Sequence, residues 1–284
     1  MIGFGPVLVR LARDAHVDPS GSAFWRVTLA LPILMIMTAR GRAASVGLRP
    51  TWIAALAGFV FAGDLVCWHY GIRYTAIAKA TVLSNMTPIL VTAAAWFMLR
   101  EAPKPVFLVG MLLGVGGSAL MALAKGGAGV NPPLGDAFSA AAAVWYAIYI
   151  LVVRHARQTM SASSLMLWSS VVGAPLLLLC ALSLHERLIP DGTLGWTALV
   201  GLGVMHVAGQ GSIAWALGRL PAPLAALVVL VQPVVAGLSA WAVFGERMTA
   251  LQALGAGVAL GGVALAQVVG RGSAPAPHAA PETP

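Results

Sequence analysis

The stretch that decides the fold is SAWAVFGERMTALQALG, residues 239–255, in which a short charged break separates two apolar blocks. A second stretch, AAAWFMLREAPKPVFLVG at residues 93–110, has the same arrangement. In both, a Trp, a Glu and a Gly keep one spacing, and each residue of the later stretch stands 145 positions after its counterpart: Trp96, Glu101 and Gly110 against Trp241, Glu246 and Gly255. Shared spacing of this kind indicates an internal duplication.

The composition places this chain in a lipid bilayer. Hydrophobic residues make up 59% of it, charged residues 9%, and the mean hydropathy is +0.87, so a soluble fold would lack a polar surface. Apolar blocks of about 17–25 residues, long enough to cross a bilayer as helices, follow one another with short polar breaks. We predict nine full spans, at residues 22–39, 52–70, 77–99, 106–124, 134–153, 165–184, 195–218, 223–244 and 251–269. Because they lack period-2 alternation, the predicted class is all-α.

Earlier blocks extend the duplication to the whole chain, as two halves of five spans. Trp25 and Trp52 correspond to Trp168 and Trp196 with small gaps. In this register residue 1 falls opposite residue 145, so residues 1–10 supply half of a tenth span, which is expected to be truncated at its start or natively short. We predict a first repeat at residues 1–124, an inter-repeat loop at 125–133, a second repeat at 134–270 and a disordered tail at 271–284.

An odd number of spans in each half makes the second half enter the membrane from the opposite side, as in the inverted repeats of many secondary transporters. With the N-terminus inside, nine Lys and Arg residues fall on the cytoplasmic side and seven on the other, while Arg26 lies within a span. This bias predicts an inner-membrane protein with both termini in the cytoplasm. The net charge of +8 reflects these loops, and we expect no nucleic-acid partner.

These residues resemble the drug/metabolite transporter superfamily in its EamA type. The stretch FWRVTLALP at residues 24–32 looks like the family's Arg near the start of the second span, here Arg26. The family's Ala-rich span entry, mid-span Pro, following Glu and Gly-rich helix match in each half: Ala80, Pro88, Glu101, Gly110 and Gly116, then Ala225, Pro233, Glu246, Gly255 and Gly261. The chain departs from the pattern in its short first span and in Ser169, which stands where a second copy of Arg26 would be. The resemblance implies ten spans in two repeats that move an amino acid, a sugar, a nucleobase-like solute or a drug.

Charged side chains inside the spans are candidates for the transport pathway. Asp64 lies near the middle of its span, where a carboxylate costs about 2.5–3.5 kcal/mol. It would serve as a proton-coupling or substrate-amine site, or as a structural carboxylate bonded to a neighbouring helix. Trp68 lies one turn further on the same face. Arg26 could hold a substrate carboxylate through two parallel N–H groups, or extend to the lipid headgroups.

Polar residues in other spans are further candidates. His206 and Gln210 share a helical face near mid-membrane, where His206 would titrate near neutral pH or donate a hydrogen bond between helices. Ser84 and Asn85 belong to a polar stripe beside Pro88, which frees a backbone carbonyl. This stripe would line a pathway or join helices at about 0.6 kcal/mol per bond.

Aromatic and small residues complete the set. Trp145 and Tyr149 lie on one face at mid-span and would form an aromatic wall for a substrate, or ordinary core packing. Pro88 and Pro233 are the expected helix breaks. Two GxxxG spacings, in the last span of each half, predict close helix packing or a homodimer contact: Gly110 with Gly114, and Gly257 with Gly261.

We therefore predict a secondary transporter, and more specifically an exporter, of a small organic metabolite such as an amino acid, working by alternating access between the repeats. Proton coupling is a further expectation. We expect no cofactor, no metal site and no ATP drive, since phosphate-binding loops and metal-ligand spacings are absent from the sequence. Two alternatives stay open: an integral membrane enzyme acting on a lipid-linked substrate, and a non-transporting membrane scaffold.

Overall fold

The computed structural model describes residues 2–40, 51–75, 77–99, 102–124, 130–245 and 248–271. Throughout these ranges the regular structure is helical, as the sequence predicted. The charged marks of the duplication, Glu101 and Glu246, lie outside the described residues, as do most of the predicted inter-repeat loop and residues 272–284 of the predicted tail.

The first half contains seven α-helices within the described ranges, several of them pieces of one broken span. A 3-10 turn, η1, precedes them. In chain order the elements are η1 Ile2–Phe4, α1 Gly5–Asp14, α2 Pro19–Thr28, α3 Leu31–Arg40, α4 Trp52–Tyr74, α5 Ile77–Ser84, α6 Thr87–Leu99 and α7 Pro105–Leu123.

The second half mixes long and interrupted helices in the same way. Its interruptions are a π-helix, η3, and a 3-10 segment, η4. In chain order the elements are α8 Pro132–Ala156, α9 Ala162–Ser183, α10 Gly192–Met205, η3 His206–Gln210, α11 Gly211–Leu217, α12 Ala222–Leu227, η4 Val228–Val231, α13 Gln232–Phe244 and α14 Ala250–Arg271.

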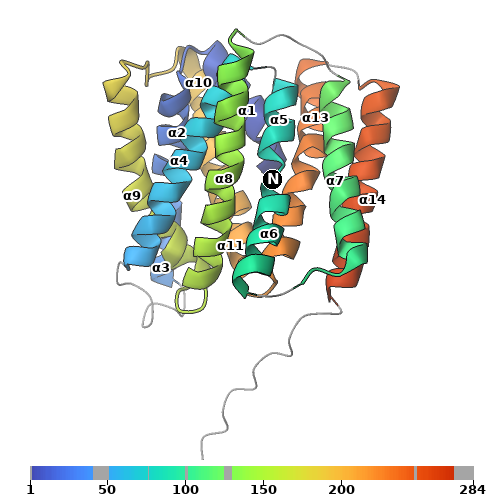
Figure 1. The fold of residues 1–284 in the computed structure, drawn as a ribbon. Helices are drawn as coiled ribbons and strands as arrows, with labels where there is room; N and C mark the ends of the chain where they lie inside the picture. The colour runs from blue at the N-terminus through green and yellow to red at the C-terminus, as the bar shows by residue number, and fades with distance from the viewer. Residues whose placement is uncertain are drawn as a thin grey trace, which may run out of the picture.

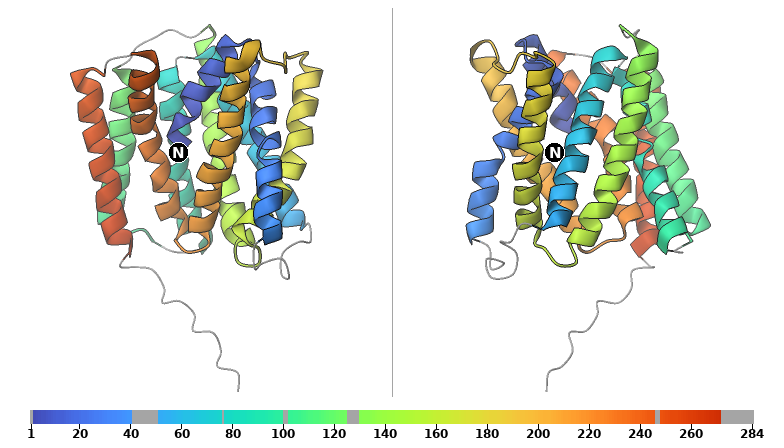
Figure 2. Two further views of the ribbon diagram at one scale, coloured as in Figure 1. Left: turned by 180° about the vertical axis from the view of Figure 1, so that it is seen from behind. Right: turned by 60° about the vertical axis from the view of Figure 1, so that its left-hand side comes forward.

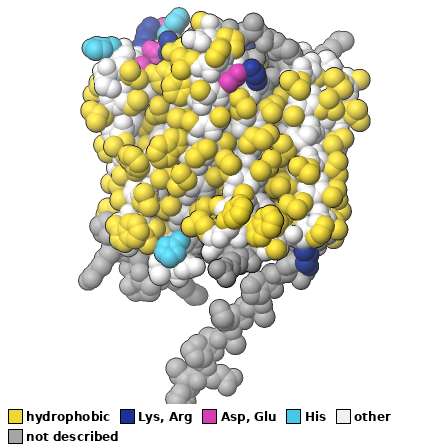
Figure 3. Space-filling model, viewed as in Figure 1, with side chains coloured by type: hydrophobic (Ala, Val, Ile, Leu, Met, Phe, Trp, Pro, Cys, Tyr) yellow, Lys and Arg dark blue, Asp and Glu magenta, His cyan; other side chains and the backbone are white. Residues whose placement is uncertain are grey.

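The bundle has the dimensions and surface of a membrane domain. Nine helical stretches of the described chain are long and apolar enough to span a bilayer, which confirms the predicted number of full spans. In addition, η1 and α1 run from mid-height to one end of the bundle, so that the first span is half-length (Figures 1 and 2). A broad belt of hydrophobic side chains covers the face in Figure 3, and charged side chains gather toward the two ends.

Equivalent helices of the two halves run in opposite directions. In Figure 1, α7 climbs toward the end of the bundle at which the first half finishes, and α14, its counterpart, descends beside it. This is the geometry of an inverted repeat, because five spans reverse the direction of the chain. Between α9 and α10, Glu186 ties the two halves together, because its Oε2 accepts hydrogen bonds from the backbone N–H groups of Ser20 at 2.7 Å and Gly21 at 3.2 Å. These bonds cap the N-terminus of α2 with a carboxylate from the other half.

The fourth span of each half is broken just before its proline. Helix α5 ends at Ser84 and α6 begins at Thr87, with Pro88 at its second position. In the second half, η4 separates α12 from α13, and Pro233 is the second residue of α13. Because proline lacks an N–H and clashes with the preceding turn, it favours a new helix start over a continuous helix.

Small residues bring α7 and α14 together along their whole length. A Cβ on Gly110 would lie 2.7 Å from the Gly262 carbonyl oxygen, and one on Gly117 would lie 2.6 Å from the Gly255 carbonyl oxygen. Such approach is possible only without side chains. Gly114 faces Leu230 of η4, whose methyl carbon would lie 2.6 Å from an added Cβ.

On α14 the packing residues differ from those predicted. A Cβ on Gly257 or Gly261 would meet nothing within 4 Å, so this GxxxG pair does not pack within the chain. The helical period turns Gly255 and Gly262 toward α7 instead, with Gly257 and Gly261 on the outward side. A homodimer contact through this outward side stays a prediction.

Neighbouring glycines of α7 should therefore differ in their tolerance of a methyl group. We expect Gly117→Ala to lower the free energy of unfolding by about 1–3 kcal/mol, because the methyl group overpacks the α7–α14 interface. Gly116→Ala, whose Cβ would meet nothing within 4 Å, should leave stability unchanged or raise it by up to about 1 kcal/mol. Unfolding in a titration with denaturing detergent measures both; equal effects would contradict this interface.

Candidate functional site

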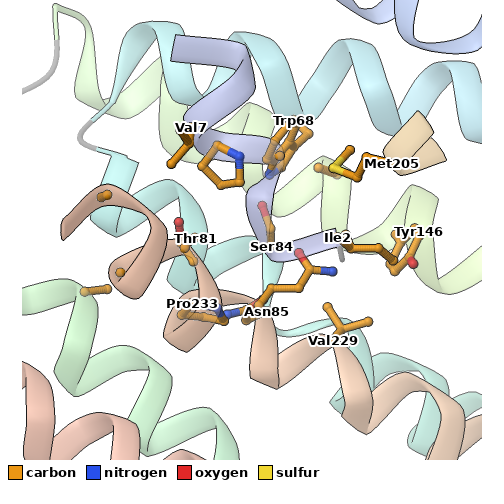
Figure 4. Close-up of a pocket in the computed structure, with 18 of the residues that line it drawn as sticks. Ile2, Val7, Trp68, Thr81, Ser84, Asn85, Tyr146, Met205, Val229 and Pro233 are labelled. Atoms are coloured by element: carbon orange, nitrogen blue, oxygen red, sulfur yellow. The ribbon is translucent and has the colours of Figure 1, made fainter. Parts of the chain in front are cut away.

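A cavity lies between the two halves of the bundle. It has about 180 Å³ of water-accessible space, many times the roughly 10–15 Å³ that one water molecule needs. Six of the residues predicted for the pathway line it, Arg26, Asp64, Trp68, Ser84, Asn85 and Gln210, and so does the predicted helix break Pro233. Figure 4 shows several of them together with Tyr146, Met205 and Ile2. The first five come from the first half and the last two from the second, so both repeats contribute.

Two opposite charges line this cavity. Arg26 is on α2 and Asp64 on α4, and both side chains are buried, with 4% and 9% of their surface exposed. Their charges interact, yet no guanidinium nitrogen lies within 4.0 Å of a carboxylate oxygen, so the pair is not closed into a salt bridge. The Arg26 guanidinium carbon lies 5.7 Å from the centre of the Phe61 ring, and Nε has no hydrogen-bond partner. A buried arginine nitrogen without a partner is costly unless a bound molecule supplies the acceptor.

The break before Pro88 places polar groups at the cavity wall. The Asn85 backbone N–H still bonds to the Thr81 carbonyl at 3.0 Å, but its side-chain Nδ2 is buried without a partner. Ser84 is less available, because its hydroxyl donates to the Ala80 carbonyl at 2.9 Å. The sequence treated these two residues alike, whereas in the structure Asn85 alone of the two holds a free donor.

Tyr146 of α8 is a lining residue that the sequence did not select. Its hydroxyl donates a hydrogen bond to Gln210 Oε1 at 3.4 Å. These two hydrogen-bonded side chains of the second repeat line the same cavity as Asn85 and Asp64 of the first. The sequence did offer a reason to consider Tyr146, because it directly follows Trp145, which was a candidate for the pathway. At 100° per residue, however, only the bundle decides which of two adjacent aromatic side chains faces the cavity.

Three predicted residues lie outside the cavity lining. Tyr149 and His206 are buried behind it on the Phe61 ring, with ring centres at 4.8 Å and 5.2 Å. His206 Nε2 lies 3.3 Å from the Ser170 hydroxyl. Trp145 packs edge-on against Phe59 of α4, with ring centres 5.8 Å apart. Tyr149 and His206 thus support Phe61, which in turn lies against Arg26.

The cavity extends toward one end of the bundle. Its lining includes Arg10 of α1 and Phe244 of α13, where the guanidinium carbon lies 4.2 Å from the ring centre, and also Gln252 of α14. In Figure 1 these helices meet at the upper end. Toward the other end α6 packs against α8 and α12, and the Thr87 hydroxyl lies 3.3 Å from the Ala143 carbonyl oxygen. The lining thus extends toward the end of the bundle at which α1, α13 and α14 meet.

Across the described ranges, no three His, Cys, Asp or Glu side chains gather closely enough to hold a metal ion. Both cysteines, Cys67 and Cys180, are free thiols.

Inverted repeats, broken helices and a polar cavity between them are features of secondary transporters. The EamA-like transporter family matches the chain in two pieces, residues 1–123 and 133–267. The chain belongs to this family. Each piece covers one half of the duplication, and family members, together with the named relatives, are transporters rather than enzymes.

Two named relatives and one crystal structure agree with this assignment. The aromatic amino acid exporter YddG of Ancylobacter novellus is 25% identical over 286 residues, covering 95% of this chain and 97% of the relative. The uncharacterized transporter YetK of Bacillus subtilis is 25% identical over 206 residues, covering 70% of this chain but only 62% of that protein. A solved crystal structure at 22% identity superposes with a TM-score of 0.77, covers 95% of this chain and 96% of its own, and shares the fold.

Water should reach the cavity but not the helix packing around it. In a Cys67→Ala, Cys180→Ala background, we expect Ser84→Cys to react with a membrane-impermeant maleimide, because Ser84 lines the cavity. Ser118→Cys, buried on α7 beside Leu230 and outside the lining, should stay unmodified under the same conditions. Labelling followed by mass spectrometry checks both positions. Protection of position 84 would mean that the cavity is closed to solvent.

Proposed function

We propose that this transporter carries a zwitterionic amino acid, and that it acts as an exporter. The observation that carries the proposal is the open pair of charges at Arg26 and Asp64, which line one cavity without forming a salt bridge. An amino acid has both complementary groups on one carbon. Its carboxylate would bond to the Arg26 guanidinium, including the unpartnered Nε, and its ammonium to the Asp64 carboxylate.

The remaining lining suits the neutral parts of such a substrate. Asn85 Nδ2 is a free donor for a second carboxylate oxygen. Trp68 and Tyr146 offer aromatic surface for an apolar side chain, with Met205 beside Trp68 (Figure 4). A relative named an aromatic amino acid exporter supports both the substrate class and the direction.

Alternating access would follow from the inversion of the repeats. We propose that residues 1–124 and 134–270 act as the two moving units, since both line the cavity. The opposite state would narrow the end of the cavity at which Arg10 contacts Phe244 and would separate α6 from α8 and α12. We further propose that the domain lies in the inner membrane with both termini in the cytoplasm, which the distribution of Lys and Arg supports.

The charge assignment can be tested by omitting one substrate group at a time. We expect purified protein to bind phenylalanine more tightly than phenylalaninamide, which lacks the carboxylate, or phenylpropionate, which lacks the ammonium. Arg26→Gln should weaken phenylalanine binding by about 30-fold or more, the factor for about 2 kcal/mol lost with a buried charge partner, and should leave the amide nearly unaffected. Asp64→Asn should weaken phenylalanine binding and leave phenylpropionate, which lacks the ammonium, nearly unaffected. Titration calorimetry in detergent measures all nine combinations.

Asp14→Asn is the matched control, because Asp14 is an exposed carboxylate at the upper end of the bundle, and it should bind all three compounds as wild type does. Unchanged phenylalanine binding in both site variants would remove Arg26 and Asp64 from the site. The wider proposal would fail if the homogeneous protein in proteoliposomes moved no amino acid or related metabolite.

We also propose that export is coupled to proton entry through Asp64. A carboxyl group that faces a water-accessible cavity can hold either a proton or the substrate ammonium, and competition between them gives exchange. In proteoliposomes with saturating phenylalanine, a pH gradient should accelerate wild-type flux severalfold, and a protonophore should abolish the acceleration. Asp64→Asn should retain slow exchange that ignores the gradient. Gradient-driven flux in this variant would exclude Asp64 as the proton carrier, whereas Asp14→Asn, at an exposed carboxylate outside the lining, should keep the wild-type response.

A further inference from the structure

Three charged side chains line the cavity within the described residues, and the proposed amino acid site uses two of them, Arg26 and Asp64. The third is Arg10 of α1, whose guanidinium carbon lies 4.2 Å from the centre of the Phe244 ring of α13. In this cation–π contact the positive guanidinium is attracted to the electron-rich face of the ring. The contact joins the first half of the chain to the second.

Both residues of the Arg10–Phe244 contact lie toward the ends of their helices. Phe244 is the last residue of α13, because Gly245 takes a left-handed conformation with φ +67° and ends the helix. Arg10 lies about one turn before the end of α1. Gln252, in the first turn of α14, lines the same part of the cavity. The contact therefore stands at the upper end of the cavity in Figure 1, and both of its side chains are partly exposed.

Phe244 is the one large side chain that α13 presents to the cavity. After the first turn of this helix, the described lining residues follow the helical period as Ala236, Gly237, Ala240 and Phe244. Alanine and glycine leave space along this wall, and the Phe244 ring fills it where the helix ends. A solute that moves along the wall to the upper end of the cavity therefore reaches the Arg10–Phe244 contact.

The contact is separate from the aromatic surface of the proposed binding site. A Cβ on Gly5 of α1 would lie 3.7 Å from the Trp68 ring, which marks the height of that surface. Arg10 lies five positions further along the same helix, which is about 7.5 Å at 1.5 Å per residue. A solute thus meets Trp68 and Arg10 at different heights in the cavity.

We propose that Arg10 selects aromatic solutes: an aromatic side chain takes the place of the Phe244 ring on the Arg10 guanidinium as the solute passes the upper end of the cavity. This inference rests on the proposed transport of amino acids. An aromatic solute exchanges one cation–π contact for another, so the passage costs little. An aliphatic solute of similar size displaces the Phe244 ring and offers the guanidinium no electron-rich face in return.

Three solutes of similar size separate the electronic effect from the steric one. Phenylalanine has an electron-rich ring face, pentafluorophenylalanine has the reversed ring quadrupole, and cyclohexylalanine has no π face. We expect proteoliposomes preloaded with each solute to release phenylalanine about 2–30-fold faster than either analogue, the factor for about 0.5–2 kcal/mol of cation–π contact. Initial efflux rates measured by mass spectrometry give the three values.

Substitutions of the two residues should act differently on this preference. Arg10→Gln should reduce it toward the ratio set by size alone, and Arg10→Lys, which keeps a cation, should retain part of it. Phe244→Leu should keep the preference, because the solute ring still gains the contact with Arg10. Phenylalanine binding by Arg10→Gln, measured by calorimetry, should stay close to that of wild type, since Arg26 and Asp64 are unchanged. Arg13→Gln is the matched control, an exposed arginine of α1 outside the lining, and should behave as wild type.

Several results would overturn the role of Arg10. An unchanged preference in Arg10→Gln would assign selection to Trp68 and Tyr146, and equal slowing of all three solutes would make Arg10 a general structural residue. Loss of the preference in Phe244→Leu would exclude the exchange of rings, and this variant keeps the test valid if Arg10→Gln does not fold. A wild-type protein that neither binds nor releases any of the three solutes would instead remove the proposed amino acid transport, and this inference with it.

Discussion

Hydrocarbon offers no hydrogen bonds, and this constraint governs where every polar group of the protein lies. Most hydroxyl groups inside the spans bond to a carbonyl one turn earlier in their own helix, as Thr92 does to Pro88 at 2.7 Å and Ser139 to Gly135 at 2.8 Å. The Glu186 carboxylate accepts hydrogen bonds from the backbone at the start of α2 and from the Tyr70 hydroxyl. Arg26 Nε and Asn85 Nδ2, by contrast, are buried without a hydrogen-bond partner, and both belong to residues that line the cavity.

The same constraint explains why broken helices accompany the cavity. A break exposes backbone groups, and in a membrane these are tolerated where protein or cavity water surrounds them. The duplication supplies the break twice, before Pro88 and before Pro233, and the inversion brings both breaks to the cavity from opposite directions. A third interruption, the π-helix η3, places Gln210 beside Tyr146. Such π-segments are often found at functional sites.

Behind the cavity, the Phe61 ring links residues that sequence reasoning could only list separately. Arg26 lies on one side of it, while Tyr149 and His206 pack around it. These two residues therefore belong to the wall that holds Arg26 in place, and not to the surface that meets the solute. A polar residue in a span can support the cavity wall or contact the solute, and its hydropathy does not distinguish these two roles.

The sequence by itself determined the solvent, the helical class, the number of full spans, the duplication and its inversion, because these depend on composition, block length and parity. Asp64, Arg26, Asn85 and Gln210 were also recognisable, since each places a polar side chain in a costly position. Only the tertiary structure decided which of Trp145 and Tyr146 faces the cavity, and which glycines of α14 meet α7. Those outcomes depend on helix rotation and on contacts between distant segments, which a linear pattern of polarity does not specify.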